Sequence, residues 1–365
     1  MKKLSVMMAL VLAVSLLAGC AGTPVVYYTN CTCPVEAHEE VTVNTPAPVE
    51  TAPAATEAVE GALKTGLALV TSVSDSKAAT AEEAGEAKYD VTIVAVTLDE
   101  NNVIRECIID GIASSVKFDA AGALATELGA VSTKNELGEN YGMVAWGGAI
   151  AEWDEQAAAL ASFAVGKTVE ELRSGAIDET GKAPAGSDLA SSATIYLGGY
   201  VSAIEAAAAN AQNLGAQAGD ALKLAVIAEN TSSTAVTEEK AGNAQLDVNV
   251  AVVTMNGETI TSCVIDSVQA KVGFDAAGAL TSDVSAAVAT KNQLGENYGM
   301  VAWGGAIAEW NEQAASFAAY VTGKTPAEVA GIAVNEKTAP AEADLAASVT
   351  IAVGGFQALI AKAAE

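Results

Sequence analysis

One twenty-residue phrase occurs twice in this chain, and it constrains the fold more than any other feature. Residues 134–153 read "KNELGENYGMVAWGGAIAEW", and residues 291–310 repeat the phrase with one change, from Glu136 to Gln293. A second phrase, "FDAAGAL", begins at Phe118 and returns at Phe274, 156 residues later. Repeats of this length are whole domains rather than solenoid units, because each is long enough to bury a core of its own.

The repeats are expected to be two tandem homologous domains, residues 62–210 and 220–365. Each begins with apolar, β-branched runs that are typical of strands. In the first repeat these are "TGLALVTSV" (65–73), "YDVTIVAVTLD" (89–99) and "VIRECIIDGI" (103–112). The turn residues "DENN" (99–102), and "NGE" (256–258) in the second repeat, predict that the last two strands form a hairpin.

Helical patterns follow the strands. The segment 150–166 places Ile150, Trp153, Leu160 and two alanines on one face and ends at Gly166. "TVEELRSG" (168–175) has a threonine cap with acids in the first turn, and "GGYVSAIEAAAANA" (198–211) closes the repeat as another helix. Strands first and helices later predict an α+β fold, with an antiparallel sheet and packed helices in each domain.

The N-terminus indicates export. Two lysines precede an apolar run (4–19) that is short for a spanning helix and ends in "LLAGC". This resembles the lipobox of bacterial lipoproteins, which implies that residues 1–19 are a signal peptide and that Cys20 is acylated. An ordinary signal peptide followed by an incidental cysteine is the alternative. Residues 20–61 would then be the lipid anchor and an acidic, proline-rich, disordered tether.

Composition excludes several functions. The formal net charge is -27 with only 17% charged residues, so the surface is acidic and would repel nucleic acid. His38 is the only histidine and lies in the tether, which argues against haem, zinc and histidine-based triads, and no metal site is expected. Cys107 and Cys263 occupy equivalent apolar runs and are expected to be buried packing residues. For Cys31 and Cys33, a disulfide, a bond to a partner and a metal contact all remain open.

A short acidic motif precedes the closing helix of each repeat. It reads "DLASSAT" from Asp188 to Thr194, and "DLAASVT" from Asp344 to Thr350. Here the sequence resembles the FMN-binding domain family, in the subset that carries FMN through its phosphate on the last threonine of Asp-Gly-x-Ser/Thr-Gly-Ala-Thr. This chain replaces the glycines of that motif and, in repeat two, its alanine; the residues at those positions are Leu189, Ser192, Leu345, Ser348 and Val349. A plain helix N-terminus is the alternative interpretation of such a motif.

The order of lipobox, tether, "TKNELGENYGM", "EWDEQA" and "DLASSATI" is similar to that of extracellular electron-transfer flavolipoproteins of Gram-positive bacteria. The resemblance implies two FMN groups, joined to Thr194 and Thr350 by a separate flavin transferase that consumes FAD. It also implies Asp188, Asp344, Ser192 and Ser348 as neighbours of the cofactor. Electrons would come from a quinol-linked donor in the membrane and leave to an extracellular acceptor such as ferric iron.

Aromatic residues concentrate in the repeated phrase. All four tryptophans lie there, in a chain with only 5% aromatic residues. Trp146 and Trp303, beside paired glycines in an expected loop, together with Tyr141 and Tyr298, are candidates to stack on the flavin ring. Trp153 and Trp310 are expected to be core residues on a helix face.

These observations predict a lipid-anchored redox carrier on the outer face of the cell membrane. In this interpretation the protein has no dedicated substrate pocket, and whether it is an enzyme stays open. The alternative is a non-redox surface lipoprotein whose duplicated domains bind a ligand or serve a structural purpose.

Overall fold

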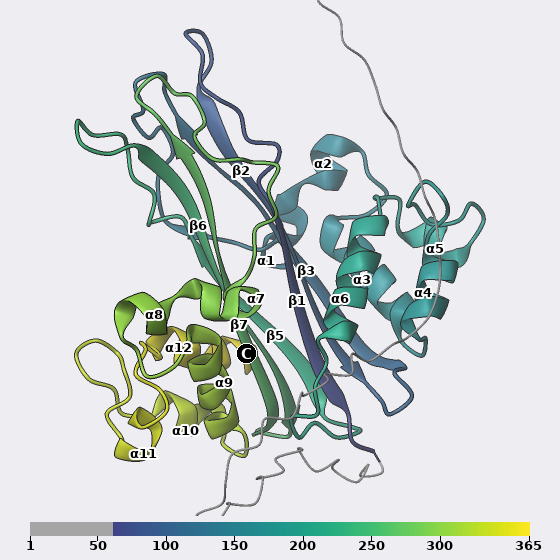
Figure 1. Ribbon diagram of the computed structural model, residues 1–365. Coiled ribbons are helices and arrows are strands. Elements are labelled where there is room, and N and C mark those ends of the chain that lie inside the picture. The colour runs from purple at the N-terminus through teal and green to yellow at the C-terminus, as the bar shows by residue number, and fades with distance from the viewer. Residues whose placement is uncertain (1–60) are drawn as a thin grey trace, which may run out of the picture. The chain divides into compact units, whose positions relative to one another are not determined.

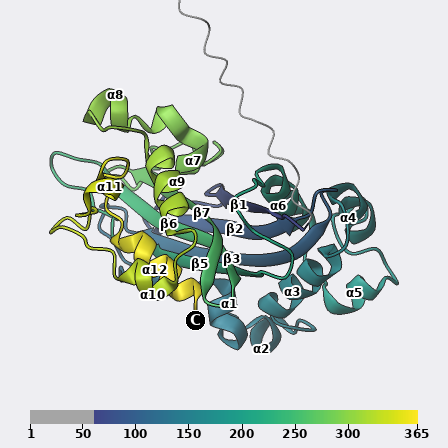
Figure 2. The same cartoon turned by 90° about the horizontal axis from the view of Figure 1, so that it is seen from below.

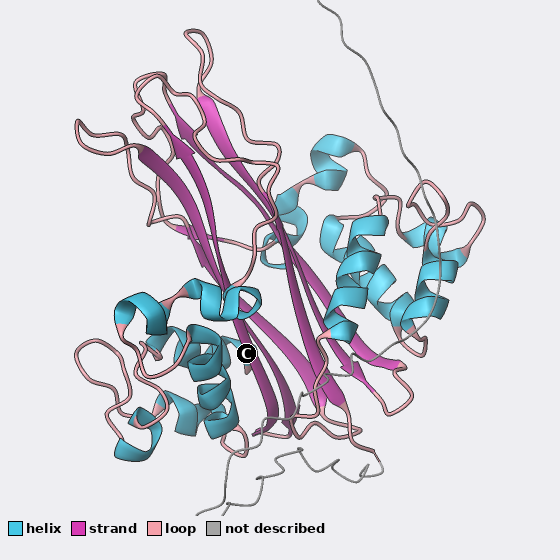
Figure 3. Ribbon diagram, viewed as in Figure 1, coloured by secondary structure: helices cyan, strands magenta, loops and turns pink. Residues whose placement is uncertain are grey.

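The computed structural model describes residues 61–365. The expected signal peptide, Cys20, Cys31, Cys33, His38 and all of the tether up to residue 60 lie outside the described residues. The described part is α+β, with two antiparallel sheets and helices, as predicted (Figure 3). The described residues form one compact unit.

The first repeat builds three long strands and then a series of helices (Figure 1). Their bounds are β1 Lys64–Ser72, β2 Gly85–Leu98, β3 Ile104–Phe118, the short β4 Ala130–Val131, α1 Lys134–Leu137, the 3-10 turn η1 Gly138–Tyr141, α2 Met143–Gly147, α3 Trp153–Ala164, α4 Val169–Ala176, α5 Asp188–Ser192 and α6 Gly198–Ala209.

The second repeat has the same order. Its elements are β5 Ala221–Glu229, β6 Gly242–Asn256, β7 Thr259–Phe274, α7 Lys291–Leu294, η2 Gly295–Tyr298, α8 Met300–Gly304, α9 Trp310–Val321, α10 Pro326–Ala330, α11 Ala343–Ala346 and α12 Gly354–Ala363.

The strands follow from period-2 patterns in which both faces are apolar. Along β2, Val91, Ile93 and Ala95 face one side of the sheet while Val94 and Val96 face the other. The hairpin between β2 and β3 turns at Asp99 to Asn102, where the Asp99 carboxylate accepts hydrogen bonds from the backbone N–H groups of Asn101 and Val103, both at 2.9 Å. Asn102 takes the left-handed conformation (φ 58°) that asparagine tolerates in turns. The hairpin prediction is confirmed.

The helix boundaries follow from capping residues. Thr168 caps α4 and forms a capping box with Glu171, as predicted, and Thr325 with Glu328 does the same for α10. The helix predicted from Ile150 begins instead at Trp153. The prediction that Ile150 shares a helix face with Trp153 and Leu160 is wrong, because Ile150 precedes the helix, and it is exposed whereas the other two are buried.

Each sheet is covered by helices on one face and by the other sheet on its opposite face. Figure 2 shows the strands in the middle, with α1–α6 on one side and α7–α12 on the other. Trp153, Leu160 and Ile204 pack on the outer face of the first sheet, and Trp310, Phe317 and Ile360 on that of the second. The inner faces form a third core that contains residues of both repeats.

The third core has an approximate two-fold relation between the repeats. The equivalent residues Phe118 and Phe274 stack on each other, with ring centroids 3.9 Å apart and planes 7° apart. The backbone N–H of Ala79 donates to the Gly278 carbonyl at 2.8 Å, and that of Val236 donates to the Gly122 carbonyl at 2.9 Å. Each half therefore has a core under its own helices and shares a further core with the other half, as in an isologous dimer.

Backbone pairing also crosses between the halves. The strand β4 of the first repeat pairs with β5 of the second, through Ala130 with Glu229 and Val131 with Ala228. In return, Val288 of the second repeat pairs with Thr71 of β1. Exchange of pairing in both directions ties the two sheets together beyond their apolar contact.

The structure accounts for the single difference between the repeated phrases, Glu136 in the first and Gln293 in the second. Glu136 of α1 forms an ion pair with Lys362 of α12, so this contact joins the two halves. The residue equivalent to Lys362 in the first repeat is Ala206, which cannot pair with Gln293 in the same way. A carboxylate is therefore useful at position 136 and would lack this partner at position 293.

Candidate functional site

The motif that ends at Thr194 folds into the short helix α5 and a turn behind it. Ser187 caps the helix, with its hydroxyl oxygen accepting from the Ala190 N–H at 3.2 Å. Leu189, within the helix, and Ala193, directly after it, are both buried, so the motif packs on the core at two points. Thr194, which follows Ala193, is exposed and presents its side chain at the surface.

The second motif repeats the pattern of buried and exposed residues around α11, although this helix has no side-chain cap. Leu345 and Val349 are buried, and Thr350 is exposed. The leucines that stand where the resembling family has glycine are therefore core anchors. Val349, which replaces the alanine, occupies the core rather than the surface around the Thr350 hydroxyl.

A buried glutamine holds each threonine. The Gln156 side-chain oxygen on α3 accepts from the Thr194 backbone N–H at 2.8 Å, the Ile195 N–H at 3.2 Å and the Thr194 hydroxyl at 3.3 Å. Gln313 on α9 makes the same contacts to Thr350 and Ile351, at 2.8, 3.2 and 3.1 Å. Both glutamines are fully buried, at 0% exposure. The same three-donor contact thus occurs at both candidate attachment residues.

One turn before Gln156, at the residue that caps α3, a buried carboxylate holds the start of α2. Glu152 accepts from the backbone N–H groups of Met143 and Val144 at 2.8 and 2.9 Å, and Glu309 accepts from Met300 and Val301 at 2.9 and 3.0 Å. These bonds satisfy two N–H groups that a helix start leaves unpaired, and they place negative charge at its positive end. The helix α3 and its capping residue Glu152 therefore support both Thr194 and α2.

The helix α2 presents an exposed tryptophan. Trp146 is 84% exposed and Trp303 on α8 is 86% exposed, and each ring lies against a glycine in the left-handed conformation, Gly142 (φ 81°) and Gly299 (φ 81°). A Cβ at Gly142 would come within 2.6 Å of the Trp146 ring, so glycine is required there by both backbone and packing. These tryptophans lie in short helices rather than in the expected loops.

In each half a tyrosine and one of the remaining tryptophans lie around a lysine, which is buried in the first half (Lys134) and half-buried in the second (Lys291). The Lys134 ammonium lies 5.5 Å from the Tyr141 ring centre and 4.8 Å from that of Trp153, and Lys291 has the same relation to Tyr298 and Trp310. Trp153 and Trp310 are buried, which confirms them as core residues. Tyr141 and Tyr298 are half-buried, so only part of each ring is accessible.

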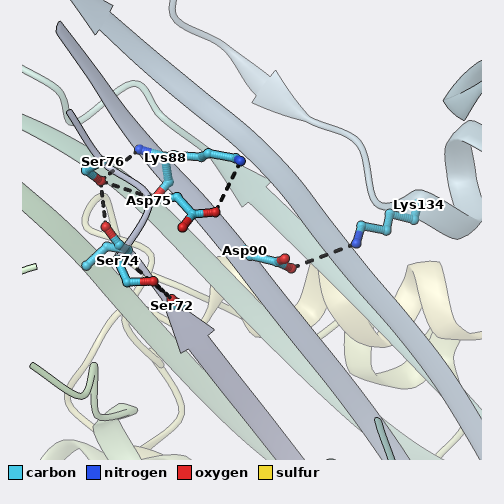
Figure 4. Close-up of polar contacts among 8 residues, drawn as sticks. Ser72, Ser74, Asp75, Ser76, Lys88, Asp90 and Lys134 are labelled. Carbon is cyan, nitrogen blue, oxygen red and sulfur yellow. Dashed lines mark hydrogen bonds and ion pairs between the residues drawn. The ribbon is translucent and has the colours of Figure 1, made fainter. Parts of the chain in front are cut away.

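Carboxylates, whose charge is opposite to that of the ammonium, lie near this lysine. Figure 4 shows the Lys134 ammonium directed at the carboxylate of Asp90, 3.8 Å away. Burial lowers the pKa of Lys134, and the nearby Asp90 and Asp110 carboxylates oppose that shift. Burial also raises the pKa of Asp110, although hydrogen bonds from Thr133 and from the backbone N–H groups of Gly111 and Asn135 act in the other direction. The second half repeats these directions at Lys291 and Asp266.

The other sequence candidates have simple placements. Asp188, Asp344, Ser192 and Ser348 are all exposed beside their threonines. Cys263 is buried and Cys107 is half-buried, both as free thiols, and burial raises the pKa of each to about 12. Between residues 61 and 365, no group of three or more histidine, cysteine or acidic side chains is arranged to hold a metal. In that same part of the chain no helix has the length and apolar character needed to span a membrane.

The structure connects Thr194 to Trp146 only indirectly. Gln156 on α3 binds Thr194, and Glu152, which caps that helix, binds α2. The helices α2 and α5 lie apart in both views (Figures 1 and 2). Sequence reasoning assigned no role to Gln156, Gln313, Glu152 or Glu309. They could have been recognised from the string "EWDEQA" and its counterpart "EWNEQA". In both strings the same glutamate precedes the tryptophan and the same glutamine follows three residues after it.

Comparison with known proteins adds no relative. No protein-family model, no curated protein and no solved structure matches this chain.

Proposed function

We propose that this protein is a lipid-anchored extracellular electron carrier with one FMN group covalently linked to Thr194 and another to Thr350. The observation that carries the proposal is the duplicated geometry of the two threonines. Each threonine is an exposed residue that follows a buried one at the end of a short acidic helix, and its hydroxyl donates to a buried glutamine. A separate modifying protein can reach an oxygen in this position, whereas a buried hydroxyl would be inaccessible to it.

The residues around each threonine suit a group that carries a phosphate and an aromatic ring. The closing helices α6 and α12 begin without a side-chain cap, so their positive dipole ends would favour a phosphodiester, although the first N–H group of α6, that of Gly198, already donates to the Gly181 carbonyl at 3.0 Å. Asp188 and Ser192, and Asp344 and Ser348, form the exposed rim of each site. Away from the threonines, on α2 and α8, Trp146 and Trp303 offer exposed rings for stacking, and Tyr141 and Tyr298 are partly accessible.

In this function the flavin ring supplies the redox chemistry, and the protein supplies attachment, orientation and surroundings. Covalent attachment retains the group outside the cell, where a freely dissociating cofactor would be lost. Acylated Cys20 would hold the protein on the outer face of the membrane, near a quinol-linked donor, and electrons would leave to an acceptor such as ferric iron. The attaching partner would be a flavin transferase.

The decisive experiment is intact-mass analysis of the mature protein from its own host. The proposal requires the added mass of two FMN groups, less one water for each. Thr194→Ala should remove one group and Thr350→Ala the other, and flavin fluorescence should persist through denaturing electrophoresis because the link is covalent. Wild-type protein without covalent flavin would refute the proposal. The exposed apolar residues of α2 and α8 would then favour the alternative, a surface lipoprotein that binds a ligand.

A further inference from the structure

Each candidate threonine is held through one oxygen atom of a fully buried amide. The backbone N–H groups of Thr194 and Ile195 both point at the Gln156 Oε1 atom, and such successive N–H groups form a concave donor site. The Thr194 hydroxyl supplies the third donor, and its bond, at 3.3 Å, is the longest of the three. In the second half the hydroxyl bond is 3.1 Å and the backbone bond of Thr350 is 2.8 Å.

The orientation of this amide is determined by its partners. Backbone N–H groups can bond only to the oxygen of the side chain, so Oε1 must face residues 194 and 195. The Gln156 Nε2 atom donates in turn to the Ala151 carbonyl at 2.8 Å, and Gln313 donates to the Ala308 carbonyl at 2.8 Å. The amide therefore cannot turn over without losing hydrogen bonds at both ends, and it is fixed in a buried site.

We propose that Gln156 and Gln313 are positioning residues that hold the hydroxyls of Thr194 and Thr350 in one rotamer for flavin attachment. This inference rests on the proposed function. In attachment, the threonine Oγ1–H bond breaks and an Oγ1–P bond forms at the FMN phosphorus of FAD, while the bond from that phosphorus to the bridging oxygen breaks and AMP leaves. An amide oxygen is too weak a base to take the proton, which passes to a basic group of the transferase.

The contact with one hydroxyl donor and two backbone donors suits the threonine both before and after flavin attachment. Before attachment, the hydroxyl proton is donated to Oε1 and selects one χ1 rotamer, so less orientational freedom has to be lost when the transferase binds. After attachment, Oγ1 has no proton to donate, but the two backbone bonds remain and keep residues 194 and 195 in place. At Thr194 the longest of the three bonds is therefore the one that the modification removes, whereas at Thr350 the backbone bond of Ile351, at 3.2 Å, is slightly longer than the hydroxyl bond, at 3.1 Å.

The first test is independent of flavin. Three-bond couplings of the Thr194 methyl group, measured in full-length protein made without transferase, report its χ1 rotamer. We expect a single rotamer in the wild type and rotamer averaging in Gln156→Met, which keeps the volume and removes the acceptor. Gln156→Glu keeps an acceptor oxygen, so it should restore the single rotamer. Averaging in the wild type, or a single rotamer in Gln156→Met, would overturn the inference.

The second test uses the two halves of one chain as each other's control. During incubation with transferase and FAD, peptide mass spectrometry follows occupancy of Thr194 and Thr350 separately. Gln156→Met should slow attachment at Thr194 on the order of tenfold and leave Thr350 unchanged, and Gln313→Met should do the reverse. Equal rates at both threonines in either variant would contradict the positioning role while leaving the proposed function intact.

A third variant separates positioning from general destabilisation. Trp153 lies on α3 with Gln156, and Trp153→Phe removes the 2.9 Å bond from its indole N–H to the Tyr200 hydroxyl of α6 without removing any bond to Thr194. Attachment at Thr194 should stay at the wild-type rate in this variant. An equal slowing in Trp153→Phe and Gln156→Met would show that loss of stability alone explains the effect. If wild-type protein accepts no flavin, the proposed function fails, and the rotamer measurement still decides what Gln156 does.

Discussion

Replacing Glu152 with alanine is expected to lower the free energy of unfolding by about 3 kcal/mol. The Glu152 carboxylate is buried and accepts from the N–H groups of Met143 and Val144 at 2.8 and 2.9 Å. Hydrogen bonds to a charged group contribute roughly 1.5–3 kcal/mol each. The lower end applies here, because Val144 is exposed and water can replace part of the lost bonding.

The measurement is chemical denaturation combined with amide hydrogen exchange. Glu152→Gln retains one acceptor oxygen and should cost about half as much as Glu152→Ala. Glu155→Ala removes only the 2.9 Å bond from the Glu152 N–H and should cost less than about 1 kcal/mol. In Glu152→Ala, the amides of residues 143 and 144 should lose protection, whereas Met300 and Val301, held by Glu309, should keep theirs.

Two outcomes would refute this reasoning. One is a loss of stability in Glu152→Ala no larger than that in Glu155→Ala. The other is unchanged protection at residues 143 and 144, which would mean that α2 is held by other contacts. Either result would return Glu152 to the role of an ordinary residue at the start of α3.

Three further predictions concern other parts of the molecule. Phe118→Ala removes one ring of the buried stack between the sheets and should cost about 3–5 kcal/mol in urea denaturation, with a similar loss in Phe274→Ala and no such loss if the sheets do not share a core. Burial raises the folded-state pKa of Asp110, so the contribution of Asp110 to stability is full below its unfolded pKa of about 3.9 and is lost as pH rises through the folded pKa. Between these two pKa values, the urea midpoint should therefore fall less with rising pH in Asp110→Asn than in the wild type. Parallel pH profiles of the two proteins would contradict this. Because Trp146 and Trp303 are exposed, Trp146→Ala and Trp303→Ala should each change stability by no more than about 0.5 kcal/mol and alter the flavin absorption of one half only; unchanged spectra in both variants would remove these residues from the flavin site.

The sequence predicted the parts of the fold that depend on near neighbours. The hairpin turn at Asp99 to Asn102 is made by a carboxylate that bonds to backbone groups two and four residues ahead. The cap of α4 needs only Thr168 and Glu171, three residues apart. Where the prediction failed, at Ile150, helical spacing continued past the true helix start, and periodicity alone does not locate a cap.

The candidate site divides in the same way. The motifs that end at Thr194 and Thr350 are visible in the sequence, because the relevant residue types are contiguous there. The support of Thr194 by Gln156 spans 38 residues along the chain, and the contact between Glu152 and Val144 joins two different helices. A glutamate or glutamine near the start of a helix has many possible hydrogen-bond partners. The sequence pattern alone does not show which of them it binds.

By itself, the sequence determined the duplication, the antiparallel strands, the capped helices and the two acidic motifs, because period, turn chemistry and capping act over a few residues. Only the tertiary structure decided that the inner faces of the two sheets form one core around Phe118 and Phe274, and that β4 of one repeat pairs with β5 of the other. It also decided which polar side chains are buried beside the threonines. The physical reason is that apolar burial and buried hydrogen bonds depend on which surfaces meet in space. Both faces of these strands are apolar, so the residue pattern along a strand does not show which face packs on the helices and which packs on the other sheet.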